Sequence, residues 1–283
     1  MNYRHGFHAG NFADVVKHSL LLMLLEALDR KPSPWAYLDT HAGAGAYDLH
    51  SEAAQRTGEA LGGIGRLWVA RMAARGKLPA AAERLCGLVA ALNPDLPEGS
   101  LPRVYPGSPR VAAAQIRQGD RLLLAELHPE EAYLLRGEMK GIAAAAVHER
   151  DGYEMLKALT PPKERRGLVL MDPPYEKADE FETAAAALKA AYARWPTGIY
   201  ALWYPIKDDS ARRRFLRGVE NSGLRKVLLT ELYLPVQADA LYGTGMLIVN
   251  PPYKVDVEAR DCLAALVPLL GADHSQVHWL VPE

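Results

Sequence analysis

The sequence predicts an α/β protein with a Rossmann-like, mostly parallel sheet of seven strands, of which the last runs antiparallel. Short apolar runs bounded by breakers alternate with longer amphipathic stretches, which is the pattern of strands and crossover helices. A glycine-rich loop, residues 40–45, follows the first run, and acidic residues follow several others. Because open α/β sheets bind ligands beyond the carboxyl ends of their strands, these positions predict one site along one sheet edge.

The composition fits one large globular domain, or a domain with an insertion. Of the 283 residues, 49% are hydrophobic and 24% are charged, and the formal net charge is −1. This balance argues against wholesale electrostatic binding to nucleic acid but leaves room for a local basic patch. Two cysteines without a metal-type spacing favour a reduced, cytoplasmic protein. The longest apolar run near the start, residues 20–25, is too short to cross a bilayer, so we expect no membrane partner.

Residues 1–46 are expected to form an irregular arm, a helix and the first strand of the main domain. Asn11 or Asp14 can cap the helix, and Lys17 and His18 lie in its first turns. The histidines of this region match no compact ligand spacing and have no cysteine or acidic cluster beside them. The sequence therefore predicts no metal site.

The first strand covers residues 35–39, and the loop that follows has glycines at alternate positions. Glycines there let the backbone come close to a ligand. The loop lacks the third glycine of the dinucleotide fingerprint, so it would serve any cofactor that bears an adenosine equally well.

Residues 47–105 change character and are predicted to be a small helical insertion. Residues 56–75 and 79–93 have amphipathic helical patterns, and no strand-like run appears anywhere in the segment. The main domain then resumes over residues 106–283.

The resumed pattern begins with a helix that we expect to have Ser108 as its N-cap and Pro109 at its first position. The second strand, residues 121–126, ends on Glu126, where nucleotide-binding sheets place an acid for the ribose hydroxyls. The usual spacing from the glycines to this acid is restored once the insertion is removed. Asp151-Gly152 follows the third strand, where an adenine edge would lie, although an ordinary Asp-Gly turn is the better explanation of the pair taken by itself.

The fourth strand, residues 167–171, runs into Asp172-Pro173-Pro174-Tyr175. The prolines have no N–H, so this tip presents acceptors, namely the Asp172 carboxylate and backbone carbonyls. Such a rim suits an exocyclic amine or an amide NH₂, with the carboxylate and the Pro173 carbonyl accepting its two N–H bonds. Tyr175 would stack on the ring that carries the amine. The alternative is that the prolines only end the strand and that Asp172 is a solvated turn residue.

The remaining pattern continues the alternation to the C-terminus. A helix over residues 178–194 precedes the fifth strand, residues 198–203, and a helix with four arginines follows. Those arginines form either a solvated face or contacts to phosphates. The sixth and seventh strands, residues 226–233 and 245–249, are close enough in sequence to form a hairpin.

A second motif, Asn250-Pro251-Pro252-Tyr253, follows the seventh strand. Since a hairpin makes that strand antiparallel, its carboxyl end lies at the opposite sheet edge from the glycine loop. Asp172, in contrast, shares the ligand edge with Glu126 and Asp151. We therefore predict Asp172, together with Pro173 and Tyr175, as the catalytic group.

Several motifs together resemble the S-adenosylmethionine-dependent amino-methyltransferases of class I, and more closely the RlmJ family, which methylates N6 of an adenine in large-subunit (23S) ribosomal RNA. The resemblance runs nearly end to end and rests on these segments: Tyr3-Arg4-His5, Phe7-His8-Ala9-Gly10-Asn11, Asp39-Thr40-His41-Ala42-Gly43-Ala44-Gly45, Tyr105-Pro106-Gly107-Ser108-Pro109, Glu126-Leu127-His128-Pro129, Asp172-Pro173-Pro174-Tyr175, Tyr200-Ala201-Leu202-Trp203-Tyr204-Pro205 and Val281-Pro282-Glu283.

The resemblance implies roles for residues at the matching positions. S-adenosylmethionine would be bound by Lys17, His18, His41, Ser108, Glu126, Asp151, Gly152 and Asp172. Asp172 would also touch the target amine, and Tyr3 would contact the RNA. We further expect a monomer that acts on naked or early-assembly ribosomal RNA, with the target base flipped into a pocket beside Tyr175.

The sequence is also compatible with two other functions. The same fold and cofactor would serve an enzyme that modifies DNA adenine or a protein glutamine amide. Alternatively, the chain is a non-catalytic RNA-binding assembly module with a dormant cofactor site.

Overall fold

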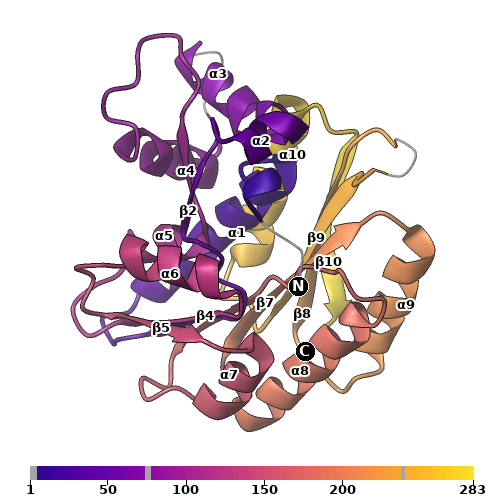
Figure 1. Cartoon of the computed structure of the whole chain (residues 1–283). Coiled ribbons are helices and arrows are strands. Elements are labelled where there is room, and N and C mark those ends of the chain that lie inside the picture. The colour runs from indigo at the N-terminus through magenta and orange to yellow at the C-terminus, as the bar shows by residue number, and fades with distance from the viewer. Residues whose placement is uncertain (1–4, 74–77, 237–239) are drawn as a thin grey trace.

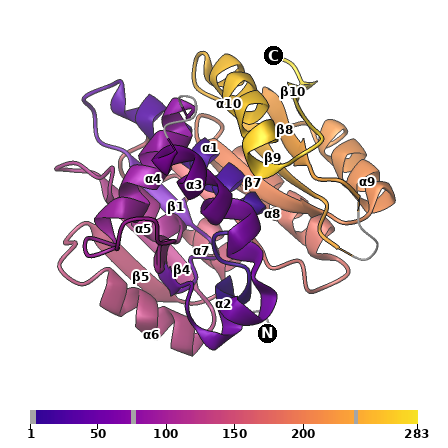
Figure 2. The same cartoon turned by 90° about the horizontal axis from the view of Figure 1, so that it is seen from above.

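The computed structural model describes residues 5–73, 78–236 and 240–283. Its centre is an eight-stranded sheet with the order β10-β8-β9-β7-β6-β1-β4-β5 (Figure 1, Figure 2). The strands are Ala36–Asp39 (β1), Arg121–Glu126 (β4), Ala145–Glu149 (β5), Gly167–Met171 (β6), Ile199–Ile206 (β7), Val227–Tyr233 (β8), Gly243–Val249 (β9) and His274–Val281 (β10). The strands from β5 to β7 in this order are parallel, whereas β9 pairs antiparallel with both β7 and β8.

The predicted α/β class and the β8–β9 hairpin are confirmed, but the sheet has one strand more than the seven predicted. The additional strand, β10, pairs antiparallel with β8 at the sheet edge. It begins with polar residues, His274, Ser275 and Gln276, and it is only partly buried. An edge strand of this kind lacks the continuous apolar run by which the buried strands were recognised.

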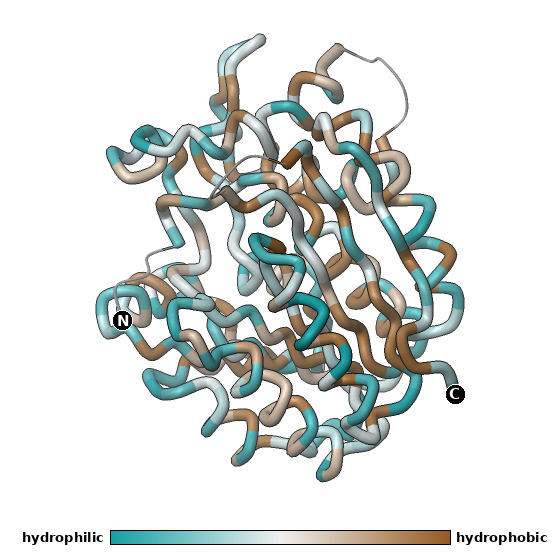
Figure 3. The backbone as a smooth tube through the Cα atoms, turned by 90° about the vertical axis from the view of Figure 1, so that its right-hand side faces the viewer, coloured by the Kyte–Doolittle hydropathy of each residue, from teal (hydrophilic) through white to brown (hydrophobic). Residues whose placement is uncertain are grey.

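Helices cover both faces of the sheet. One face packs against α1 (Phe12–Asp29), α5 (Ser108–Ala113), α6 (Pro129–Glu138) and α10 (Val255–Leu270), and the other against α7 (Gly152–Leu159), α8 (Glu180–Arg194) and α9 (Asp209–Glu220). Helix α4 (Ala80–Ala91) packs on α1 and α10 and extends the first of these cores away from the sheet. In β6 the side chains alternate between the two cores, because successive residues of a strand point to opposite faces. Figure 3 shows the hydrophobic strands running through the interior and hydrophilic segments at many of the outer turns.

The leucine-rich helix α1 lies against this sheet and carries two of the predicted site residues. Asn11 is its N-cap, and the side chain of Asn11 accepts a hydrogen bond from the Asp14 N–H at 2.9 Å. Most side chains of α1 are buried, including Lys17 and His18. Within the described ranges, no helix has both the length and the hydropathy needed to cross a bilayer.

The segment between β1 and β4 is mostly helical, but in shorter pieces than predicted. It contains α2 (Glu52–Thr57), the π-helical turn η2 (Leu61–Gly65), α3 (Arg66–Met72) and α4. The helix expected over residues 56–75 is interrupted because Gly58 adopts a left-handed conformation, with φ of 64°, and ends α2. Two short strands, Ala46–Asp48 (β2) and Val104–Pro106 (β3), pair antiparallel where this segment begins and ends. The prediction of no strand here was wrong, since three residues are too few to show a period.

Candidate active site

The carboxyl ends of the parallel strands bring the predicted acidic residues to one edge of the sheet. Asp39 ends β1, Glu126 ends β4, and Asp172 follows β6 directly. Asp151 follows β5 and caps α7 by accepting hydrogen bonds from the N–H groups of Tyr153 and Glu154. The shared edge predicted from the sequence is confirmed.

The second Pro-Pro motif lies at the opposite edge. Asn250 follows the antiparallel strand β9, and Val249 is paired with Tyr200 at the start of β7. The Asn250 amide donates to the carbonyls of Pro196 and Gly198, both at 2.8 Å. Asn250 therefore has a structural role. Its amide anchors the segment that leads into β7, at the sheet edge opposite Asp172.

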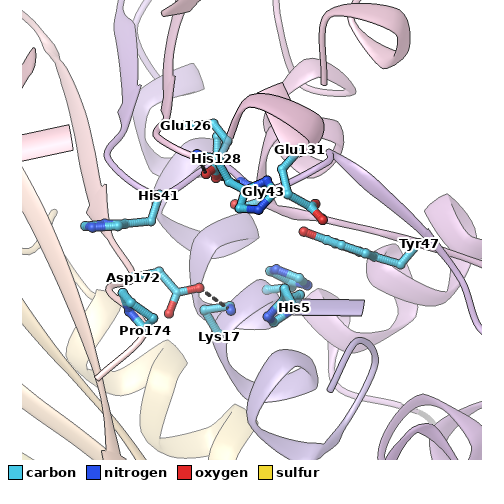
Figure 4. A pocket seen from close by; sticks show the side chains of 14 residues that line it. His5, Lys17, His41, Gly43, Tyr47, Glu126, His128, Glu131, Asp172 and Pro174 are labelled. Atoms are coloured by element: carbon cyan, nitrogen blue, oxygen red, sulfur yellow. Dashed lines mark hydrogen bonds and ion pairs between the residues drawn. The ribbon is translucent and has the colours of Figure 1, made fainter. Parts of the chain in front are cut away.

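A pocket at the ligand edge is lined by six of the residues predicted to bind the cofactor: Lys17, His18, His41, Ser108, Glu126 and Asp172. Figure 4 shows Lys17, His41, Glu126 and Asp172 facing one space from different elements. We call this space the first pocket. Its lining also includes His5, Tyr47, His128 and Glu131, which sequence reasoning did not single out as ligand contacts. His5 lies in the short N-terminal helix His5–Phe7, Tyr47 lies in β2, and His128 and Glu131 lie where the chain leaves β4 and enters α6.

The other predicted residues lie elsewhere. Among the residues that the structure describes, Asp151 and Gly152 are not part of the first-pocket lining, although Gly152 packs directly on the loop after β1. A Cβ at Gly152 would stand 1.8 Å from the Thr40 carbonyl oxygen, so only glycine fits there. Pro173 is buried. Tyr3 lies outside the described residues.

Glu126 is held by two backbone N–H groups and faces the pocket. Its Oε2 accepts from Gly43 at 2.8 Å, and its Oε1 accepts from His128 at 2.7 Å. Gly43 has a φ of 60°, so the loop turns in a conformation that favours glycine. Each carboxylate oxygen keeps acceptor capacity for one further donor, which suits a pair of vicinal hydroxyls.

Ser108 does not cap its helix, contrary to the prediction. Gly107 is the N-cap of α5, and the Ser108 hydroxyl instead donates to Asp39 Oδ2 at 2.7 Å. The Tyr37 hydroxyl donates to the same oxygen at 2.7 Å. The two hydrogen bonds favour the charged carboxylate and lower the pKa of Asp39. Burial outweighs them and raises this pKa to about 6. The Ser108 hydroxyl bonds to the buried carboxylate that ends β1 and not to a backbone N–H group of α5, because a hydrogen bond to a charged acceptor is stronger.

Asp172 forms an ion pair with Lys17 across the fold. Lys17 Nζ lies 2.5 Å from Asp172 Oδ2 and 2.8 Å from Asp14 Oδ1. Only 4% of the Lys17 side chain is exposed. Burial alone would lower the pKa of Lys17, but the two carboxylates outweigh it and raise the pKa above its ordinary value. Lys17 therefore stays cationic, and one oxygen of Asp172 is fixed on it.

Asp14 is the main site residue that the sequence reasoning missed, because it was considered only as a helix cap. The Asp-x-x-Lys spacing on one helix was the available signal, since residues three apart are neighbours on a helix surface. The second partner of Lys17 is Asp172, which lies 155 positions further along the chain, and no local spacing predicts it.

Two of the histidines that line the first pocket, His18 and His41, are uncharged at neutral pH. His18 Nδ1 lies 2.9 Å from the Tyr105 hydroxyl, and the two rings are stacked. Burial lowers the pKa of His18 to about 3 and that of His41 to about 4. Neither ring is therefore a source of positive charge in the pocket.

We expect His18 to make the protein less stable as the pH falls. An unfolded histidine titrates near pH 6.5, whereas burial lowers the pKa of His18 to about 3 in the folded protein. Below pH 6.5 the unfolded chain takes up a proton that the folded chain excludes, so stability present at pH 7 is lost progressively toward pH 3. This group alone contributes a loss of about 2 kcal/mol between pH 7 and pH 5. Urea unfolding at both pH values measures it.

The matched variant is His18→Gln, which keeps a polar group for Tyr105 but does not titrate. Its loss of stability between pH 7 and pH 5 is expected to be smaller by about 2 kcal/mol. Asp39, whose pKa burial raises to about 6, acts in the opposite direction and is present in both proteins. Equal losses in the two proteins would show that His18 is not responsible.

A larger cavity, which we call the second pocket, joins the first at Asp172. Both are lined by His5, Lys17, Asp172 and Pro174. The second pocket also has an aromatic corner, formed by Tyr175 and Trp203 with ring centroids 5.8 Å apart and planes at 67°. The Tyr175 hydroxyl donates to the Trp203 carbonyl at 2.7 Å, and Tyr175 has a φ of 51°. A strained, anchored tyrosine after the prolines is thus held in the cavity wall.

The arginine helix α9 has at least one structural arginine. Arg212 makes a bidentate pair with Glu231, which is fully buried, through Nε at 2.6 Å and an NH2 group at 2.5 Å. Arg213 pairs with Asp209 at 2.6 Å on the same helix. These contacts explain Arg212 and Arg213 without a phosphate.

Known proteins match the chain over most or all of its length. A family model described as "Ribosomal RNA large subunit methyltransferase D, RlmJ" matches residues 32–281. The chain is 43% identical over 289 residues to ribosomal RNA large subunit methyltransferase J of Escherichia coli, and 39% identical over 288 residues to that of Haemophilus influenzae. Each alignment covers 100% of both chains.

A solved structure has the same fold over nearly the whole chain. Protein LPL1258 from Legionella pneumophila superposes with a TM-score of 0.87 at 36% sequence identity, covering 96% of this chain and 98% of that one. With matches of this length and identity, the chain belongs to the RlmJ family of ribosomal RNA large subunit methyltransferases.

Proposed function

We propose that this protein methylates N6 of a specific adenosine in large-subunit ribosomal RNA, with S-adenosylmethionine as the methyl donor. The observation that carries the proposal is the junction of the two pockets at Asp172. One pocket has the groups for a nucleoside cofactor, and the other has an aromatic corner suited to a base. Its relatives from Escherichia coli and Haemophilus influenzae, which are named as ribosomal RNA large subunit methyltransferases, support the choice of RNA as substrate.

The residues of the first pocket fit S-adenosylmethionine. Glu126 offers acceptors to the ribose hydroxyls. His128 has a buried Nδ1 without a hydrogen-bond partner among the described residues, and it lines this pocket beside Glu126. A buried polar atom without a partner in a pocket indicates a ligand contact. His18, His41, Ser108 and Asp172 complete the proposed binding set, with Asp151 and Gly152 behind the loop that carries His41.

The chain would hold the target amine with acceptors only. Asp172 Oδ2 is fixed on Lys17, so Oδ1 and the Pro173 carbonyl are the acceptors that we assign to the two N–H bonds. Accepting both bonds directs the nitrogen lone pair away from the ring plane and toward the first pocket. When bound, S-adenosylmethionine supplies an electrophilic methyl group to that nitrogen.

We attribute the rate of methyl transfer to the positioning of the target amine and to electrostatic stabilisation of the charge that it gains. Charge develops on the amine as the new bond forms, and the Asp172 carboxylate lies where that charge is stabilised. Asp172 need not be a strong base, because a methylated arylammonium loses its proton readily. The buried Lys17 keeps the carboxylate oriented through its contact with Oδ2.

Replacing Tyr175 with alanine is expected to lower kcat/KM for the RNA about 30-fold, because a stacked base loses an aromatic partner worth about 1–3 kcal/mol. The affinity for S-adenosylmethionine should change less than about threefold, since Tyr175 lines the second pocket only. Steady-state kinetics and calorimetry measure the two quantities. The control is Tyr253→Ala in the second Pro-Pro motif, where the side chain is 81% exposed and no change is expected.

The decisive test of the function is a mass-spectrometric map of N6-methyladenine in ribosomal RNA from cells with and without this protein. One adenosine that loses its methyl group without the protein, and regains it on incubation of naked RNA with the protein and S-adenosylmethionine, is the expected result. Methylation of duplex DNA or of a protein glutamine instead would redirect the assignment. Failure to bind S-adenosylmethionine in calorimetry would favour a non-catalytic RNA-binding module.

A ribosomal RNA substrate also accounts for the expected cytoplasmic location. We propose that a single copy of the chain is sufficient, since the two pockets are built from one chain. The same incubation, carried out once with naked RNA and once with an early ribosomal assembly particle, shows which of the two is the better substrate.

A further inference from the structure

The helical insertion contacts the segment that leads into α1. We call residues 5–11 the arm; it begins with the short helix η1, His5–Phe7. The Thr57 hydroxyl donates to the Phe7 carbonyl at 2.5 Å, and the Ile64 N–H donates to the Gly10 carbonyl at 2.8 Å. The insertion therefore binds the arm at two separate backbone positions.

Glu59 adds a contact from each of its carboxylate oxygens. Oε1 lies 2.9 Å from His8 Nδ1, and Oε2 accepts from the Asn11 amide at 2.9 Å. Glu59 precedes the π-helical turn η2, a form of helix that often marks functional positions. One side chain of the insertion thus bridges the middle and the end of the arm.

The fit between the two segments is close. A Cβ at Gly63 would lie 2.2 Å from the Gly10 carbonyl oxygen and 2.3 Å from the Asn11 carbonyl carbon. Only a glycine in η2 lets the insertion reach the arm backbone at this distance. The contact is therefore built into both segments.

From Asn11 a continuous set of contacts leads to Asp172. The Asn11 side chain caps α1 by accepting from the Asp14 N–H at 2.9 Å. Asp14 pairs with Lys17 at 2.8 Å, and Lys17 pairs with Asp172 at 2.5 Å. Asp14 also accepts from the arm itself, from Gly10 N–H and from His5 Nε2, both at 2.9 Å. The place of Lys17 beside Asp172 therefore depends on how the arm is held.

We propose that Glu59 is a positioning residue. Through the contacts of Glu59 with the arm, the helical insertion holds the first turns of α1 so that Lys17 contacts Asp172. The inference deepens the proposed methyl transfer and rests on it for its catalytic consequence. It assigns the insertion a role in the reaction although Glu59 lies four contacts from Asp172, by way of Asn11, Asp14 and Lys17.

Hydrogen exchange tests, without RNA, whether Glu59 holds the arm in place. In Glu59→Ala, amides of the arm and of the first turn of α1 should exchange at least about tenfold faster than in the wild type, because they open locally more often. The matched control is Glu83→Ala, which removes an exposed salt bridge to Arg71 within the same insertion and does not touch the arm. Faster exchange in both variants, or in neither, overturns the proposal.

Kinetics tests the consequence for Asp172. In Glu59→Ala, kcat should fall about tenfold, the equivalent of one hydrogen bond to a charged group. The affinity for S-adenosylmethionine should stay within about threefold, because Glu59 does not line the first pocket. Glu59→Gln should restore most of kcat, since its amide can accept from Asn11 and donate to His8. A glutamine variant as impaired as the alanine variant contradicts the positioning role.

The two experiments separate this inference from the proposed function. If the wild type methylates no adenosine in ribosomal RNA, the function fails, whereas the exchange rates still decide whether Glu59 holds the arm. If the wild type methylates and Glu59→Ala exchanges faster with an unchanged kcat, the function stands and the positioning role is wrong.

Discussion

Asp172→Asn is expected to lower the rate of methyl transfer about 1000-fold, which is the largest effect of any single substitution considered. Asparagine keeps the shape but brings an NH₂ group where two donors already converge, the Lys17 ammonium and the target amine. Whichever way the amide turns, one N–H faces another N–H. The rate is measured in single turnovers with saturating S-adenosylmethionine and RNA, so that binding does not limit it.

The control for this substitution is Asp179→Asn, an exposed residue after the same motif whose side chain does not cap α8. We expect its rate to equal that of the wild type. Calorimetry with S-adenosylmethionine should show that the Asp172→Asn protein is folded and binds the cofactor, although more weakly, since Asp172 belongs to the proposed binding set. Near-normal methyl transfer by Asp172→Asn would remove the proposed mechanism.

Lys17→Met is expected to reduce kcat about 100-fold and to destabilise the fold by about 3 kcal/mol. Without the ammonium, the Asp14 and Asp172 carboxylates, with side chains 3% and 14% exposed, face each other with no cation between them. Asp172 also loses the contact that orients its Oδ2. Urea unfolding gives the stability, and single-turnover kinetics at a temperature where the variant is folded gives the rate.

The matched variant is Lys177→Met, which removes an exposed lysine beside the Asp-Pro-Pro-Tyr motif. Its stability should stay within about 0.5 kcal/mol of the wild type, as for most surface substitutions. If Lys17→Met loses stability but not kcat, the buried lysine is structural only and the orientation of Asp172 has another cause.

The parallel strands and the sheet edge at which the acidic residues gather followed from local patterns. Buried parallel strands are short apolar runs, and Asp39, Glu126 and Asp172 each come at the end of one or directly after it, so their common edge needed only the topology rule. The same rule assigned Asn250 to the opposite edge, because a short connection makes a hairpin.

Long-range polar partners could not be predicted in this way. Ser108 looked like a helix cap because serine before proline favours that role locally, yet the buried Asp39 takes its hydroxyl. Glu59 had no local feature that distinguished it from a solvated charge of an amphipathic helix. Its two partners, His8 and Asn11, lie 51 and 48 positions away in the sequence.

By itself, then, the sequence determined the α/β class, the strand ends that carry acids, and the acceptor-only tip after β6, because these depend on burial, breakers and the chemistry of single side chains. Only the tertiary structure decided that Lys17 reaches Asp172, that two pockets meet there, and that the insertion holds the arm. The physical reason is that a charged or hydrogen-bonding group acquires its partner through chain packing, and spacing along the sequence does not encode distances between distant segments.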